Sequence, residues 1–276
     1  MIRSCLLLVL LLFSAQAADV KKRNTFAFFG IGVQSMDYSA DFTDKNGDKY
    51  RDDMRISGSM YYTGTGAKYN EDWSFSILAG SSFAAALSDT AALSNDKGKH
   101  VAHSGDLYLA EIFVHANYTL APRQYLVMGL GYSNETIKRY LFDFDDLVIS
   151  PVTETNTVAG VTELGYSFSN LFENSRFYYD LSLTLTLPVV AYTGEFYAAD
   201  TFKESEDFNF TYGIGILPRI LFGYALTKEW GLTVMSSYYY RYYFTPSALQ
   251  FQTVTLRSDN NTLRRIRASL IINWRF

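Results

Sequence analysis

The sequence lacks the residues on which several classes of protein depend. Its single cysteine, Cys5, lies in an N-terminal segment that we expect to be removed, so the mature chain has neither a disulfide nor thiol chemistry. No later apolar run approaches the ~18 residues of a transmembrane helix. The net charge is −4 and no basic run occurs, which argues against nucleic-acid partners.

The N-terminus has the three parts of a secretory signal peptide. A basic start, Met1-Ile2-Arg3, precedes the unbroken apolar run 6–13, and Ala15-Gln16-Ala17 is a small-x-small cleavage site. The apolar run is too short to cross a bilayer as a helix, which takes ~20 residues. We therefore predict a signal peptide over residues 1–17 and a single barrel domain over residues 18–276.

The C-terminal segment alternates between two kinds of residue. One of the two sets is mostly polar and includes Arg265 and Arg267. Period-two alternation places the two sets on opposite faces of a strand. A membrane barrel requires this pattern, because hydrocarbon lies outside it and a polar lumen inside. The apolar face consists of Ile266, Ala268, Leu270, Ile272, Trp274 and Phe276.

Aromatic residues make up 17% of the chain, with 22 Tyr and 21 Phe. A membrane barrel uses them in girdles at its two interfaces. The last strand, with Trp274 and the terminal Phe276, also resembles the C-terminal assembly signal of bacterial outer-membrane β-barrel proteins. This resemblance implies a porin-like or small outer-membrane barrel surrounded by outer-membrane lipids. It also implies the barrel-assembly machinery and periplasmic chaperones as partners in biogenesis.

Ten segments have the length and alternation of membrane strands. Their connections alternate long and short, as outer loops and periplasmic turns do. The sequence therefore predicts an all-β fold, a transmembrane antiparallel up-and-down β-barrel of ten strands, with eight or twelve left open. Both termini would be periplasmic and the protein a monomer. The segments are 24–36, 54–67, 72–86, 106–120, 123–134, 154–169, 175–192, 207–226, 230–245 and 262–276.

Strand parity assigns the charged residues of the central strand regions to the inward face. One interpretation is the selectivity filter of a narrow channel for ions or small polar solutes, with opposed acidic and basic walls. The other is a closed barrel filled by paired charges, acting as a structural or adhesin-like protein through its long loops. The inward residues are Glu111, His115, Glu163, Asp180, Arg219, Arg241, Arg265 and Arg267.

The first long connection contains a weak match to a calcium loop. Its candidate ligands are Asp44, Asn46, Asp48 and Asp52. Lys49 stands where such a loop requires glycine, and Arg55 where it requires a bidentate carboxylate. We therefore favour a hairpin tip at Asn46-Gly47 and expect no metal and no cofactor.

The three histidines do not form a recognisable enzyme site. None lies in the Asp-x-His of the ten-stranded omptin proteases or the His-x-Ser of the outer-membrane phospholipase. His103 and Ser104 are adjacent, so on a strand they would point to opposite faces. An acid–base pair of His103 and Asp106 at the rim is the remaining hydrolase hypothesis, and it predicts turnover that is sensitive to His103→Ala. We therefore expect that the protein is not an enzyme.

Overall fold

The computed structural model describes residues 25–43, 47, 49–84, 86–95, 100–143, 148–173, 175–198, 201–243, 248–251 and 254–275. Within these ranges no helix is long and apolar enough to cross a bilayer. The predicted signal peptide and Phe276 lie outside the described residues. The strands are β1 (Thr25–Thr43), β2 (Lys49–Lys68), β3 (Trp73–Ser82), β4 (Ala86–Asn95), β5 (His100–Ala121), β6 (Gln124–Asp143), β7 (Val148–Ser169), β8 (Phe177–Ala198), β9 (Thr201–Ala225), β10 (Trp230–Tyr243), β11 (Ala248–Phe251) and β12 (Val254–Arg275).

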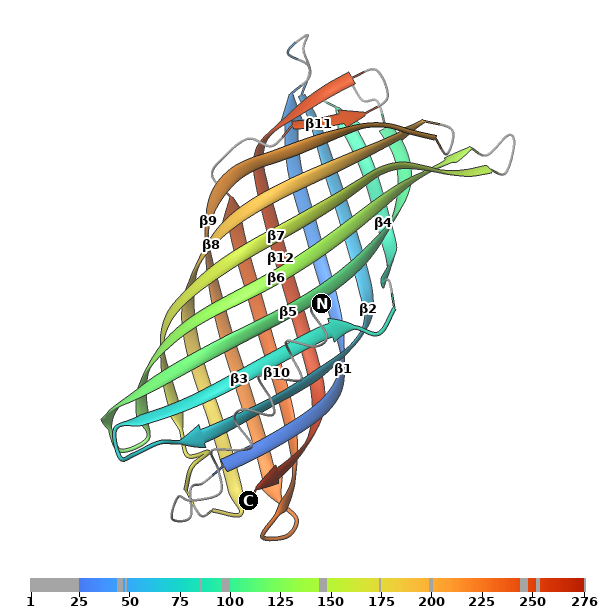
Figure 1. Cartoon of the computed structure of the whole chain (residues 1–276). Helices are drawn as coiled ribbons and strands as arrows, with labels where there is room; N and C mark the ends of the chain where they lie inside the picture. Colours follow the sequence, from blue (N-terminus) through green and yellow to red (C-terminus); the bar gives the residue numbers. More distant parts are fainter. Residues whose placement is uncertain are drawn as a thin grey trace.

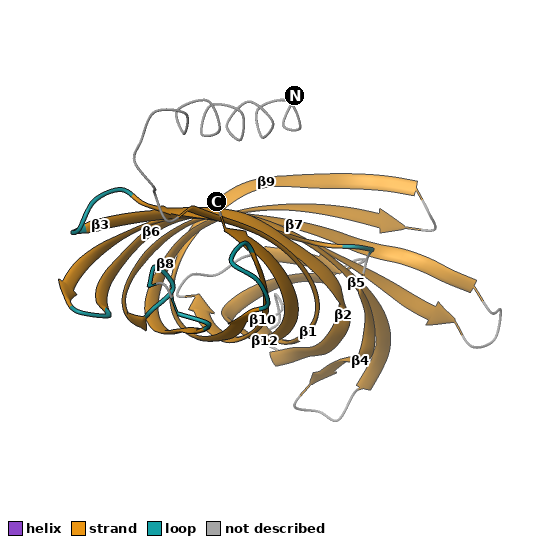
Figure 2. Cartoon of the chain, turned by 90° about the horizontal axis from the view of Figure 1, so that it is seen from below, coloured by secondary structure: helices purple, strands orange, loops and turns teal. Residues whose placement is uncertain are grey.

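The strands form one closed antiparallel barrel, because β1 pairs with β2 on one side and with β12 on the other. β3 and β4 both pair with β2 and β5, so they are two halves of one barrel strand. β11 pairs only with the outer end of β12. The predicted ten-stranded barrel is confirmed. The strands lie strongly tilted around the lumen, as seen along the barrel in Figure 2.

The predicted short turns are confirmed, but the predicted long loops are largely strand. Short turns join β2 to β3, β5 to β6, β7 to β8 and β9 to β10. Thr25 pairs with Ala67 and Arg275 with Phe26, so both ends of the described barrel lie at the short-turn end. At the other end, strand pairing continues through most of the segments predicted as loops. Figure 1 shows these hairpins, β6–β7 and β8–β9 among them, reaching well beyond the body of the barrel.

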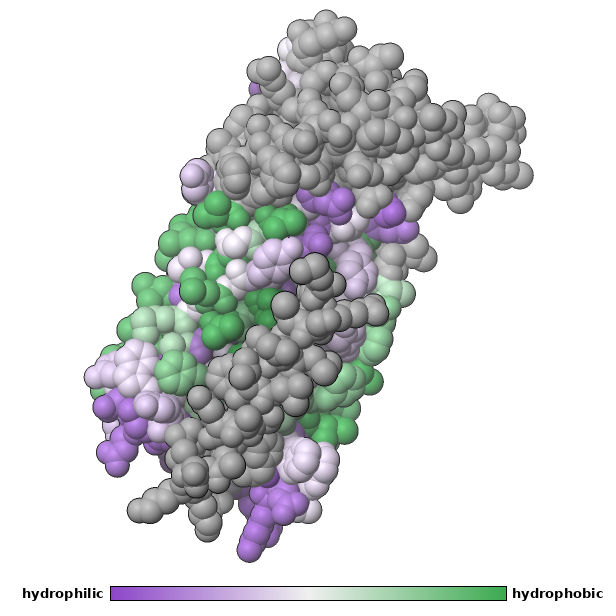
Figure 3. Space-filling view, viewed as in Figure 1, coloured by the Kyte–Doolittle hydropathy of each residue, from purple (hydrophilic) through white to green (hydrophobic). Residues whose placement is uncertain are grey.

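The outer wall carries an apolar belt between polar ends (Figure 3). On β5 it runs from Tyr108 to Tyr118 and on β10 from Trp230 to Tyr238, matching the ~9–11 residues of a membrane strand. Aromatic side chains lie at its margins, and Trp274 stacks on Trp230 with ring centroids 5.5 Å apart. Its exposed apolar residues include Phe29, Ile31, Val33, Leu181, Leu183, Leu185, Leu187, Ile266, Leu270 and Ile272.

Beyond this belt the barrel reverses its polarity. From Phe29 to Val33, β1 has large apolar side chains outside, and the inward positions between them are glycines. From Met36 onward, the apolar residues are inside and the acidic residues outside, where Asp37 binds Arg55 at 2.6 Å. Water outside and an apolar core inside is the usual arrangement of a soluble barrel. The reversal therefore marks the end of the apolar belt on β1.

The β5–β6 turn has a residue in the left-handed backbone region. Pro122 is followed by Arg123 with φ 66°, the pattern of a type II turn, where glycine is usual in the second place. Arg123 also donates two hydrogen bonds, at 2.7 and 2.8 Å, to the Glu173 carboxylate in the β7–β8 turn. The ion pair thus joins two neighbouring turns.

Glu173→Gln is expected to lower the unfolding midpoint slightly at pH 7. The hydrogen bonds from Arg123 hold the pKa of Glu173 below its usual value. A lowered pKa contributes stability above the unfolded pKa of about 4.3 and loses it as the pH falls through the folded pKa. The difference between Glu173→Gln and the parent should therefore shrink as the pH falls through the lowered pKa of Glu173. Urea titrations at pH 7 and pH 3 check this, with Glu229→Gln in another short turn as the control. A difference that is as large at pH 3 as at pH 7 would contradict it.

Candidate functional site in the barrel lumen

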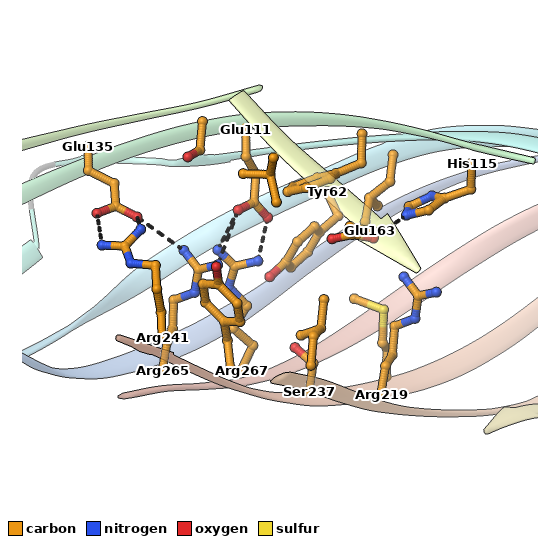
Figure 4. Close-up of a pocket in the computed structure, with 17 residues that line it drawn as sticks. Tyr62, Glu111, His115, Glu135, Glu163, Arg219, Ser237, Arg241, Arg265 and Arg267 are labelled. Atoms are coloured by element: carbon orange, nitrogen blue, oxygen red, sulfur yellow. Dashed lines mark hydrogen bonds and ion pairs between the residues drawn. The ribbon is translucent and has the colours of Figure 1, made fainter. Parts of the chain in front are cut away.

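A layer of buried arginines and glutamates crosses the lumen. Arg267 on β12 donates from both terminal nitrogens to Glu111 on β5, one of these bonds being 2.9 Å long. Arg241 on β10 makes the same two-pronged contact with Glu135 on β6, at 3.2 and 3.1 Å. Arg265 lies between them, with Nη2 3.4 Å from Glu111 and Nη1 3.9 Å from Glu135. Figure 4 shows the glutamates and the arginines extending from opposite walls.

Each of the three arginines also lies over a tyrosine ring of the lumen. The guanidinium carbon of Arg241 is 4.2 Å from the Tyr243 ring centroid, and that of Arg265 is 5.1 Å from Tyr239. Arg267 lies 5.7 Å from the ring of Tyr62, which is completely buried. The rings favour the cations through their negative faces and fill the space between the charges. The layer is therefore packed as well as paired.

A second polar layer lies closer to the short-turn end. His115 Nε2 and Glu163 Oε2 are 2.8 Å apart, and both side chains are buried. Asp180 accepts a hydrogen bond from Ser167 and lies 4.0 Å from Arg219. Arg219 is less enclosed than the arginines of the first layer, since its side chain is 19% exposed. This layer thus contains both a tight buried pair and a loosely held cation.

All eight residues that strand parity assigns to the inward face lie inside the barrel, and the structure shows which of them meet. Glu163 is paired with His115 rather than with Arg219, and Glu111 closes the arginine layer from the opposite wall. Glu135 lies just past the predicted strand 123–134, yet it continues the inward parity of Gly131 and Ser133 on a longer strand. A role in ion selectivity for these residues stays a prediction.

An apolar cluster closes the lumen on the outer side of the arginine layer. It is formed by inward side chains of β1, β2, β5, β6, β10 and β12, none more than 8% exposed. These are positions where the reversed polarity of the wall turns apolar residues inward. On these six strands the inward side chains at this level are therefore closed off from water. The cluster comprises Met36, Tyr38, Ala40, Met54, Ile56, Leu107, Ile137, Tyr239 and Leu263.

On the short-turn side of the arginine layer the lumen is hollow. Three cavities of about 40, 100 and 60 Å³ lie in this part of the lumen. All three are lined by His115 and Arg219, so these two residues lie where the cavities meet. The first is also lined by the arginine layer, and the second reaches Arg275 at the end of the barrel. The first cavity therefore connects the short-turn side of the lumen with the charged layer.

The remaining predicted sites are tested only in part. Of the weak calcium candidate, Asp44, Asn46 and Asp48 lie outside the described residues, and Asp52 is buried on the inner face of β2. Among the described residues no group of three acidic, histidine or cysteine side chains is arranged to hold a metal. The side chain of His103 lies outside the described residues, so the rim-hydrolase hypothesis is untested.

Comparison with known proteins identifies the fold. The chain is similar to the outer membrane protease OmpT of Escherichia coli, with a TM-score of 0.63 over 94% of this chain and 99% of that one, at 10% identity. It also matches the translocator domain of autotransporter NalP from Neisseria meningitidis at 12% identity, covering 99% of this chain and 96% of that one with a TM-score of 0.40. No family model and no curated protein matches. The chain thus has the fold of a bacterial outer-membrane β-barrel, and this likeness assigns it no activity.

Proposed function

We propose that the chain is an integral protein of the bacterial outer membrane with a closed barrel. In this proposal the barrel is a rigid anchor, and the hairpins beyond the outer interface act in structure or surface interaction. One observation carries it: the lumen is filled by a paired arginine–glutamate layer and, directly beyond it, by an apolar cluster. The short-turn end, with both ends of the described barrel, would face the periplasm.

A narrow channel is the second candidate, and the cavities favour it. They hollow the lumen from its periplasmic end up to Glu111 and Arg265, and the loosely held Arg219 lines all of them. A solute entering from that side would meet the charged layer after passing His115 and Arg219. Conduction would require the arginine–glutamate pairs to part and the apolar cluster to open. The closed barrel requires neither change.

Planar-bilayer recording of the full-length mature protein tests these candidates. We expect no discrete conductance steps from protein whose heat-modifiable electrophoretic mobility shows that it is folded. The electrophoretic mobility is a necessary control, because an unfolded chain would also give no conductance steps. Discrete steps would contradict the closed barrel, and a changed ion preference in Arg219→Ala or Arg241→Ala would then support the channel.

A further inference from the structure

Part of the lumen near the short-turn end has an apolar wall, although the interior of a membrane barrel is usually polar. This wall lines the cavity of about 100 Å³, and most of it belongs to one packed cluster that also contains Tyr62. An apolar ligand would gain free energy by replacing water at such a surface. The apolar side chains of the wall include Phe28, Leu78, Leu221, Met235 and Ile271.

Arg219 lines the same cavity and has unused hydrogen-bond donors. Its guanidinium makes no hydrogen bond with a described residue, and the nearest carboxylate oxygen, Oδ2 of Asp180, is 4.0 Å away. The side chain is 19% exposed, and its nitrogens are not enclosed by other side chains. A guanidinium has five N–H donors, so an acceptor in the cavity would find several of them unoccupied.

Other polar side chains of the lining bind one another. The hydroxyl of Tyr178 is 2.8 Å from Thr233 Oγ1 and donates to Asn273 Oδ1 at 2.9 Å. Arg275 lies over the Tyr178 ring, 4.5 Å from its centroid, and is partly exposed at the end of the barrel. Arg219 is therefore a charged group from which a ligand gains a hydrogen bond without displacing a partner.

The balance of charge in the lumen argues against an ionic ligand. An added ion would lie uncompensated in a place with little water. A purely apolar ligand would instead cover the donors of Arg219 without accepting from them. Both costs are absent for a neutral molecule with an apolar body and one oxygen acceptor. The four arginines of the two polar layers face four carboxylates, those of Glu111, Glu135, Glu163 and Asp180.

We propose that this cavity binds one small neutral alcohol, with its apolar body against Met235 and Ile271 and its oxygen at Arg219. An apolar cavity of about 150 Å³ accepts benzene. The cavity of about 60 Å³ has Arg219, Asp180 and His115 in common with this one, so together they offer space for a ligand of that size. Binding there needs no opening of the arginine layer, so the proposal holds for a closed barrel and for a channel.

Methionine-methyl NMR of the full-length mature protein in detergent micelles tests the proposal, with phenol as the probe. Met235 lines the cavity, whereas Met128 has the parity of the outward Leu130 and reports phenol that dissolves in the micelle. We expect the Met235 signal to shift to saturation and the Met128 signal to change only in proportion to the phenol added. Toluene, which lacks the hydroxyl, should bind about tenfold or more weakly, as expected for the loss of a hydrogen bond from a charged donor.

Two variants locate the binding. Leu221→Trp fills the cavity and should abolish the saturable shift of Met235. Leu232→Trp is the matched control, because Leu232 is 39% exposed on the outer face. Arg219→Leu, made together with Asp180→Asn so that no lone charge remains, should remove the preference for phenol over toluene.

Three results overturn the proposal. A Met235 shift that does not saturate means that phenol only dissolves in the micelle, and a saturable shift that survives in Leu221→Trp places the binding elsewhere. Equal affinities of the parent protein for phenol and toluene remove Arg219 from the site. If Leu221→Trp does not fold, Overhauser contacts between the phenol ring and the Met235 methyl group of the parent decide. Their presence supports the site, and their absence overturns it.

Discussion

Glu111→Ala is expected to lower the free energy of unfolding by about 3–5 kcal/mol, because it leaves buried arginines without their partner. Glu111 accepts two hydrogen bonds from Arg267 and the closer contact of Arg265, and it is 5% exposed. Breaking an ion pair in such a place removes the attraction while the desolvated cations remain. Urea unfolding of the protein in lipid vesicles, followed by tryptophan fluorescence, measures the change.

Asp37→Ala provides the exposed counterpart to this substitution. Asp37 and Arg55 also form a close ion pair, at 2.6 Å, but their side chains are 47% and 60% exposed. An exposed pair of this kind contributes about 0–1 kcal/mol. Removing both partners of the buried pair, as in Glu111→Gln with Arg267→Met, should cost less than the sum of the single changes. Equal costs for Glu111→Ala and Asp37→Ala would show that the lumen is wet at this level.

Leu183→Arg is expected to cost about 2–4 kcal/mol, the price of an arginine near the middle of the bilayer on the lipid face of a barrel. Leu183 is 52% exposed on β8, within a run of outward leucines from Leu181 to Leu187. Its neighbour Thr184 is 2% exposed and faces the lumen. The cost arises only if hydrocarbon covers the outer face at this height.

Leu226→Arg is the matched control for the lipid face. Leu226 is 65% exposed and lies in the β9–β10 turn, beyond the end of β9. The same exchange near the interface costs about 0–1 kcal/mol. Both variants are unfolded by urea in vesicles of one phosphatidylcholine. If the two substitutions have the same small effect, the apolar belt does not lie in the bilayer at the height proposed.

The sequence predicts the membrane part of the barrel well, for a physical reason. Lipid outside imposes one rule on every strand, so the parity of Leu181 or Ile266 identifies the face directly. The predicted first strand ends at Met36, and that is where the rule changes. Beyond it the apolar residues of β1 continue on the other parity, at Met36, Tyr38 and Ala40. The alternation of β1 therefore changes phase there, and the sequence does not predict that its strand continues.

The pairing of the lumen charges was less predictable. Strand parity predicts that Glu163 and Arg219 point inward. Which side chains form contacts across the lumen depends on the tilt and stagger of the strands. That geometry brings Glu111 on β5 to Arg267 on β12, across the barrel. The inward position of Glu135 could be predicted from the parity of Ser133, although Glu135 lies past the predicted end of its strand.

The reversal of polarity along β1 also sets the depth at which the barrel would lie in the proposed outer membrane. A strand residue advances about 3.3 Å, so a slip of two residues moves the tilted barrel by roughly 5 Å along the membrane normal. Sinking by that amount would carry Asp37 and its partner Arg55 toward hydrocarbon, and rising would expose Val33 and Ile31 to water. Both movements are unfavourable, so the ion pair and the apolar belt together fix the depth of the barrel in the proposed outer membrane. A thinner or thicker bilayer must adapt to the barrel, rather than the barrel to the bilayer.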